Sequence, residues 1–280
     1  MLFLFIIFLL LLIYIYTKIS VILFVILLFF LIYLFYLSLK QYNIYLFVLS
    51  VVIFILLLPS ILFYSDLCLM YPYISYVKND IKGMKRDCCN FLDKHFNCNI
   101  RDIYHIKKCK GPVIYILNHH LGNDKMLDML YHLKIPGNNS VVVTGGETRY
   151  EIIKNLYSNL NTVKLSKKSK GNMRIFLHKC KKKIYQGNNI VIFPEGKYTD
   201  KKRSWNKLLA FQSGAFILSK QYNIPIIPVL ISGGNYEYGL IIHSDITMKY
   251  LEPLYPSNYD SIDEYRDDAL QLMNLELSNI

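Results

Sequence analysis

The first 65 residues contain only two charged side chains, Lys18 and Lys40, and this constrains the fold more than any other feature. Short polar breaks divide the segment into three apolar runs: 1–16, 21–37 and 44–64. A bilayer core of about 30 Å takes roughly 20 helical residues, and backbone groups in lipid must bond within their own segment. We therefore predict two or three transmembrane helices in residues 1–65, as the anchor of an integral membrane protein.

The rest of the chain is basic. All 20 acidic residues and 30 of the 32 basic residues follow residue 65, which gives this part a net charge of +10. Such a charge on a membrane-attached domain favours an anionic partner: lipid headgroups, phosphorylated metabolites or nucleic acid. The six cysteines have no paired spacing of the kind that binds zinc, so we expect reduced thiols in a domain that faces the cytosol.

Residues 66–110 are predicted to connect the membrane segment to a domain over 111–280. An amphipathic helix is expected at 78–96, either on the membrane surface or as an ordinary surface helix. Strand-like runs in the following part lie at 112–117, 140–144, 162–165, 190–193, 226–231 and 246–250. Helical patterns lie at 124–133, 148–158, 171–186 and 207–221, and a capping box at Ser261 begins a last helix at 262–278. This alternation predicts an α/β domain, with helices covering a mixed, largely parallel sheet.

An apolar run at 113–117 ends abruptly in polar residues, among them His119 and Asp124, with Gly122 between them. A histidine that exchanges a proton near neutral pH needs an acceptor on its second ring nitrogen. Asp124 can supply that acceptor if the chain turns back at Gly122. We interpret His119 and Asp124 as a candidate catalytic dyad.

A second apolar run, 190–193, ends in the turn Pro194-Glu195-Gly196. Ligands in open α/β sheets bind where strands end at their carboxyl side. Gly196 also permits close backbone approach to a ligand. The ends of the two runs, with His119 on one and Glu195 on the other, are therefore expected to form two walls of one site.

Four segments in order resemble the glycerolipid acyltransferases, the 1-acylglycerol-3-phosphate acyltransferases and their relatives. Asn118-His119-x4-Asp124 is similar to the family's NHx4D motif, and Phe193-Pro194-Glu195-Gly196 to its FPEG motif. Residues 208–216 and 225–229 resemble the two later motifs. The resemblance covers about 110–231. It implies an α/β enzyme in which His119 and Asp124 are catalytic.

The positions that hold the substrate phosphate in the family depart from its pattern. Lys197 follows the FPEG motif where Thr-Arg is usual, and Lys167 stands where the second motif has arginine. Lysine carries its charge on a single ammonium group and cannot make the bidentate hydrogen bonds that an arginine guanidinium makes to a phosphate. The resemblance implies that Glu195, Gly196, Lys197 and Lys167 bind substrate. Nothing in the motifs requires a metal or other cofactor.

The activity implied is transfer of an acyl chain from acyl-CoA to a hydroxyl of a lysophospholipid, with 1-acylglycerol 3-phosphate giving phosphatidic acid as the first expectation. Glycerol 3-phosphate as acceptor, or a phospholipid as acyl donor, stays open. The expected location is an internal membrane such as the endoplasmic reticulum, with the domain facing the cytosol. The alternative is a membrane-anchored protein that binds anionic lipid or nucleic acid through a degenerate site. Nucleic acid is not expected, because the basic residues lack interleaved aromatic side chains.

Overall fold

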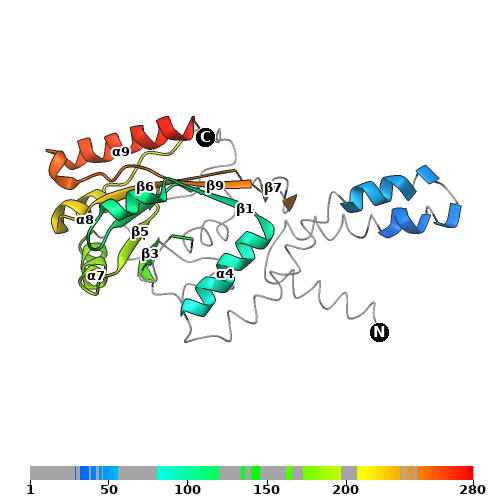
Figure 1. Cartoon of the computed structure of the whole chain (residues 1–280), viewed down its shortest axis with the longest axis horizontal. Helices are drawn as coiled ribbons and strands as arrows, with labels where there is room; N and C mark the ends of the chain where they lie inside the picture. Colours follow the sequence, from blue (N-terminus) through cyan, green and yellow to red (C-terminus); the bar gives the residue numbers. More distant parts are fainter. Residues whose placement is uncertain are drawn as a thin grey trace.

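A computed structural model gives the fold of the chain (Figure 1). The residues that it describes are 29, 32–37, 39–41, 44–45, 47–55, 81–119, 134–135, 140–145, 162–165, 173–196, 207–233, 236–237, 240–241 and 245–279.

A seven-stranded sheet with the order β1-β9-β6-β2-β5-β3-β4 forms the centre of the domain. Its strands are β1 (Asn97–Arg101), β2 (Ile114–Leu117), β3 (Ser140–Gly145), β4 (Val163–Leu165), β5 (Asn189–Ile192), β6 (Ile226–Gly233) and β9 (Asp245–Tyr250). All neighbours pair in parallel except β6 and β9. The prediction of a mixed, largely parallel sheet is therefore confirmed.

The direction of the strands decides where functional residues gather. The five strands β6, β2, β5, β3 and β4 run the same way, so their carboxyl ends lie at one edge of the sheet. Strand β2 lies between β5 and β6, and all four of its residues are buried. His119 comes just after β2, and Glu195 just after β5. The fold therefore brings the two predicted walls together at the carboxyl edge.

Three helices pack against the parallel strands: α7 (Met173–Tyr185), α8 (Gly214–Tyr222) and α9 (Ile262–Leu277). Between these helices and the sheet lies an apolar core that includes Ile114, Phe176 and Phe216. The predicted capping box is present, because Ser261 Oγ accepts from the Glu264 N–H and the Glu264 carboxylate accepts from the Ser261 N–H. This pair fixes the start of α9.

All six predicted strand runs contain a strand, and the helix expected at 171–186 is α7. The helix expected at 207–221 is shorter than predicted, since α8 begins at Gly214. The reason is that N–H groups before Gly214 bond outside any helix: Leu209 to Glu195, and Gln212 to the Pro194 carbonyl. The helices predicted at 124–133 and 148–158 lie outside the described residues.

Helix α4 (Ile81–His95) confirms the amphipathic helix expected near 78–96. Its apolar side buries Cys88, Phe91 and Leu92, and the helix packs against β1. Strand β1 was not predicted; it pairs with β9, so the sheet begins within the segment expected to be a connector. The short 3-10 helix η1 (Ile103–Lys108) follows it, and a second one, η2 (Pro256–Asn258), precedes α9. A two-stranded hairpin, β7 (Tyr236–Glu237) and β8 (Leu240–Ile241), follows β6.

Part of the predicted membrane segment is described, and it is helical at 32–37 and 47–55, drawn in blue in Figure 1. The rings of Phe35 and Phe47 lie 5.6 Å apart. No helix among the described residues reaches the length and apolar character that a membrane crossing requires. The run 1–16 lies wholly, and the runs 21–37 and 44–64 lie partly, outside those residues.

Candidate active site at the carboxyl edge

The side chain of Asn118, the first residue after β2, makes the bonds to β6 that the backbone makes along the strand. Asn118 is buried, and its Nδ2 donates to the Ile231 carbonyl at 3.0 Å while its Oδ1 accepts from the Ile231 N–H at 2.8 Å. Both groups of Ile231, on the neighbouring strand β6, are thus bonded by one side chain. Buried backbone groups left without partners are costly, so this contact fixes where the chain leaves the sheet.

His119 is positioned from the other side, by residues that follow β5. Its backbone N–H donates to Glu195 Oε1 at 2.8 Å. Its ring stacks on Phe193, with the ring centroids 4.5 Å apart and the planes inclined by 10°. The candidate base therefore has its backbone held by one residue of the FPEG motif and its ring plane by another.

The Glu195 carboxylate links two segments of the site. Its second oxygen, Oε2, accepts from the Leu209 N–H at 2.8 Å, and the residue is 1% exposed. The two carboxylate oxygens thus bond to the backbone of the β2 end and to the backbone before α8. The binding of substrate by Glu195, expected from the sequence, stays a prediction. The contact with two backbone N–H groups adds a positioning role that the sequence did not indicate.

Gly196 closes the turn after β5. Its N–H donates to the Phe193 carbonyl at 3.1 Å, and its φ of +68° lies in the left-handed region that favours glycine. A Cβ at this position would stand 3.1 Å from the Gln212 Cγ. Gln212 in turn donates its N–H to the Pro194 carbonyl at 2.7 Å. The turn and the segment before α8 are therefore locked together.

Of the predicted site residues, the structure brings together His119, Glu195 and Gly196. Asp124, Lys167 and Lys197 lie outside the described residues, so the dyad and the phosphate ligands stay predictions. The roles of Asn118 and Phe193 were not predicted from the sequence. Both stand inside the motifs next to the residues that were singled out, and that adjacency was the available signal.

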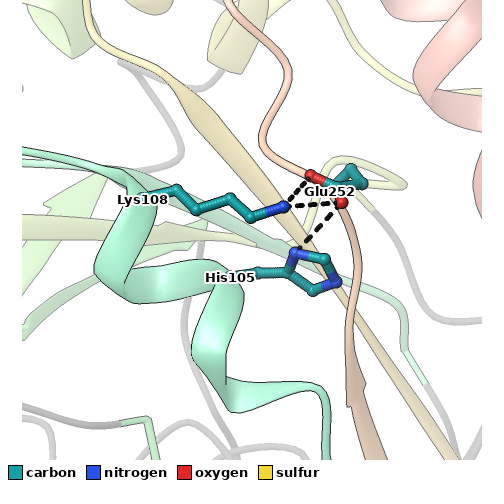
Figure 2. A network of polar contacts seen from close by, with 3 residues as sticks. All are labelled: His105, Lys108 and Glu252. Carbon is teal, nitrogen blue, oxygen red and sulfur yellow. Dashed lines mark hydrogen bonds and ion pairs between the residues drawn. The ribbon is translucent and has the colours of Figure 1, made fainter.

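A second histidine, His105, lies beside a glutamate at the opposite edge of the sheet (Figure 2). It is buried in η1, and its Nδ1 lies 3.4 Å from Glu252 Oε1. Lys108 Nζ donates to both Glu252 oxygens, at 2.7 and 2.9 Å. This hydrogen bond raises the pKa of Lys108 and lowers the pKa of Glu252. The cluster joins η1 to the segment that follows β9.

A comparison with known protein families places both motif turns within one family domain. The acyltransferase family model matches residues 95–232, a range that includes β2, β5 and both motif turns. Residues 95–232 of the chain belong to the acyltransferase family. The resemblance inferred from the four motifs is thus confirmed, and the chain is an acyltransferase at the family level.

Among the solved structures that match is one that shares the fold. It is the crystal structure of the 1-acyl-sn-glycerophosphate (LPA) acyltransferase PlsC from Thermotoga maritima, which superposes with a TM-score of 0.60 at 17% sequence identity. The match covers 80% of this chain and 95% of that one. At this identity the likeness concerns the fold alone. No curated protein gives a significant match.

Proposed function

We propose that this acyltransferase is membrane-bound and transfers an acyl chain from acyl-CoA to a hydroxyl of a lysophospholipid, with 1-acylglycerol 3-phosphate as the first acceptor to test. The observation that carries the proposal is the position of His119, whose backbone is bonded to Glu195 where two neighbouring parallel strands end. The shared fold with an enzyme named for acylating a lysophosphatidic acid supports the choice of acceptor.

In the proposed reaction, His119 removes the proton of the lysolipid hydroxyl while the oxygen attacks the thioester carbonyl carbon. A C–O bond forms, the C–S bond breaks, and the departing CoA sulfur receives the proton from the histidine. Asp124 orients the imidazole and stabilises its charged form, which is the role of the acid in hydrolase triads. The chain uses no covalent intermediate of its own in this scheme.

The remaining predicted residues act on the substrate. Lys167 and Lys197 supply positive charge for the acceptor phosphate, while Glu195 and Gly196 shape the wall beside it. Backbone N–H groups near Gly122 or Gly196 are the expected donors to the tetrahedral oxyanion. The N–H of Gly196 itself donates within its turn, so the expected donors are its neighbours. No metal or resident cofactor enters the scheme.

The bilayer enters the proposal through the acceptor and product, which are both lipids, and through residues 1–65. Large apolar side chains on the described helical residues of this segment are exposed, among them Tyr45 at 83%, Ile44 at 64% and Ile55 at 60%. Contact with lipid would cover them. We place the catalytic domain on the cytosolic side of an internal membrane such as the endoplasmic reticulum, where acyl-CoA is available.

The test uses membranes that contain the full chain, one labelled acyl-CoA and a panel of lysolipids and glycerol 3-phosphate, with products resolved by headgroup. Acylation of 1-acylglycerol 3-phosphate that is lost in His119→Ala and Asp124→Asn supports the proposal. The matched control is His178→Ala, which changes an exposed histidine on α7. Full activity in His119→Ala would show that the dyad is wrong, and acylation of another acceptor alone would replace the substrate.

A further inference from the structure

The end of β2 shows how the site is built. Strands β2 and β6 pair in parallel with Leu117 opposite Val229. If the ladder continued in register, His119 would come opposite Ile231, and the two backbone groups of Ile231 would bond to the backbone on either side of His119. His119 would then be one more residue of a buried strand. The side chain of Asn118 prevents this, because it bonds to both groups of Ile231.

The primary amide of asparagine can do this because it carries the same groups as a peptide: one carbonyl acceptor and N–H donors. Asn118 ends the backbone ladder on β6, because its side chain takes the two bonds of Ile231 that the backbone on either side of His119 would otherwise make. The N–H of His119 faces the other neighbour, because the N–H groups of successive strand residues point to opposite sides, and it donates to Glu195 after β5. Asn118 and Glu195 together anchor the base between two strands.

We propose that Asn118 is a positioning residue for acyl transfer: its side chain replaces the backbone ladder at Ile231 and thereby places the His119 ring against Phe193 at the carboxyl edge. This inference rests on the proposed function, in which His119 is the base. Asn118 is 3% exposed, so it acts through His119 and not on substrate. A catalytic group misplaced by about 1 Å can lose about 100-fold in rate, so the effect falls on turnover and not on substrate affinity.

Two variants test the donor and the whole contact. Asn118→Asp keeps the shape of the side chain but offers an acceptor to the Ile231 carbonyl, while Asn118→Ala removes both bonds. The matched control is Asn189→Ala, because Asn189 Oδ1 accepts from the Val113 N–H at the opposite end of the same strand β2. All three variants lose a bond between a side chain and the backbone, but only the Asn118 variants lose it beside His119.

Activity per folded molecule is the first readout, with folding followed by thermal unfolding in detergent. We expect kcat to fall about 100-fold in both Asn118 variants with KM within about 3-fold of wild type, and to stay within about 3-fold in Asn189→Ala. A fall of kcat in the control equal to that in the Asn118 variants would overturn the proposal, because the effect would then be general loosening of β2. Unchanged kcat in both Asn118 variants would also overturn it.

A second readout does not depend on acyl transfer. Diethyl pyrocarbonate modifies histidine rings, and mass spectrometry gives the rate at His119 with the exposed His178 as internal reference. We expect the His119 rate to change at least about 3-fold in the Asn118 variants and not in Asn189→Ala, because the ring leaves its stacked position. An unchanged rate would overturn the positioning role. Failure of the wild type to acylate any acceptor would instead refute the proposed function and leave this readout to decide the role of Asn118.

Discussion

Two histidine–glutamate pairs lie at opposite edges of the same sheet, and they are built in opposite ways. At the carboxyl edge, Glu195 is 1% exposed and bonds to backbone N–H groups of His119 and Leu209. At the other edge, the Glu252 side chain is 61% exposed and contacts the imidazole of His105 and the ammonium of Lys108 (Figure 2). The buried carboxylate of Glu195 fixes the positions of two backbone segments. The exposed carboxylate of Glu252 instead bonds to the side chain of Lys108 and lies beside that of His105.

The difference separates a site that positions a reactive group from a contact that joins two surface segments. A base has to be held in place without the group that holds it occupying the ring nitrogen that takes the substrate proton. Glu195 meets this need because its two carboxylate oxygens accept from backbone N–H groups, while Phe193 holds the ring by its face. His105 points a ring nitrogen at its glutamate, as expected of a structural histidine.

The largest effect is expected from removing the two histidines in turn. His119→Ala should lower kcat/KM about 10²- to 10⁴-fold, because a positioned general base contributes that much. His105→Ala should leave the activity per folded molecule within about 3-fold, since its cluster lies at the far edge and contributes only to stability. Acylation assays normalised to folded protein measure both. Equal losses of activity in the two variants would show that the two edges do not differ in function.

The next effect compares the two glutamates. Glu195→Gln puts an amide NH2 where one backbone N–H now donates, so a buried donor loses its acceptor at a cost of about 1–3 kcal/mol. We expect about a 10- to 100-fold fall in kcat as His119 shifts. Glu252→Gln changes an exposed ion pair and should alter the free energy of unfolding by less than about 1 kcal/mol. Thermal unfolding of the full chain in detergent, with kcat, distinguishes them; a larger loss in Glu252→Gln would reverse the interpretation.

The arrangement at the carboxyl edge was largely predictable from the sequence, and the reason is local. The apolar, β-branched runs that became β2, β5 and β6 predict buried parallel strands, and the motif residues stand directly at their ends. The capping box at Ser261 needs only residues three positions apart. Features that depend on residues close together in the sequence could be predicted. Parallel strands end at the same edge of a sheet, so the shared edge of His119 and Glu195 could be predicted as well.

What could not be predicted depends on bonds between distant segments. The start of α8 was misplaced because the N–H groups of Leu209 and Gln212 bond to the turn after β5 and not within a helix. Strand β1 was missed because it is an exposed edge strand without an alternating apolar pattern. The pairing of His105 with Glu252 requires the parallel pairing of β1 with β9, and no sequence motif predicts that pairing.

A smaller effect is expected from the ring that supports His119. Phe193→Leu keeps an apolar side chain but removes the stacked face, and aromatic pairs contribute about 0.5–1.5 kcal/mol beyond burial. If that energy holds the productive orientation, kcat should fall about 3- to 10-fold. Phe193→Tyr retains the ring face and is the matched control, with activity near wild type. Steady-state kinetics on both variants checks this, and equal kcat values for the leucine and tyrosine variants would show that the stacking does not matter.

The smallest effect concerns the exposed pair and depends on pH. The hydrogen bond from Lys108 lowers the pKa of Glu252 from its ordinary value of 4.5, so the folded state binds this proton more weakly than the unfolded state. The stabilisation is therefore present above pH 4.5 and is lost as the pH falls through the lowered pKa. Melting temperatures measured from pH 7 down to pH 3 should fall less steeply in Glu252→Gln than in wild type. Glu195→Gln provides the contrast, because it should lower the melting temperature already at pH 7, where Glu252→Gln has little effect. Parallel curves for wild type and Glu252→Gln would mean that the far-edge carboxylate contributes nothing through its charge, and the comparison between the edges would then rest on Glu195 alone.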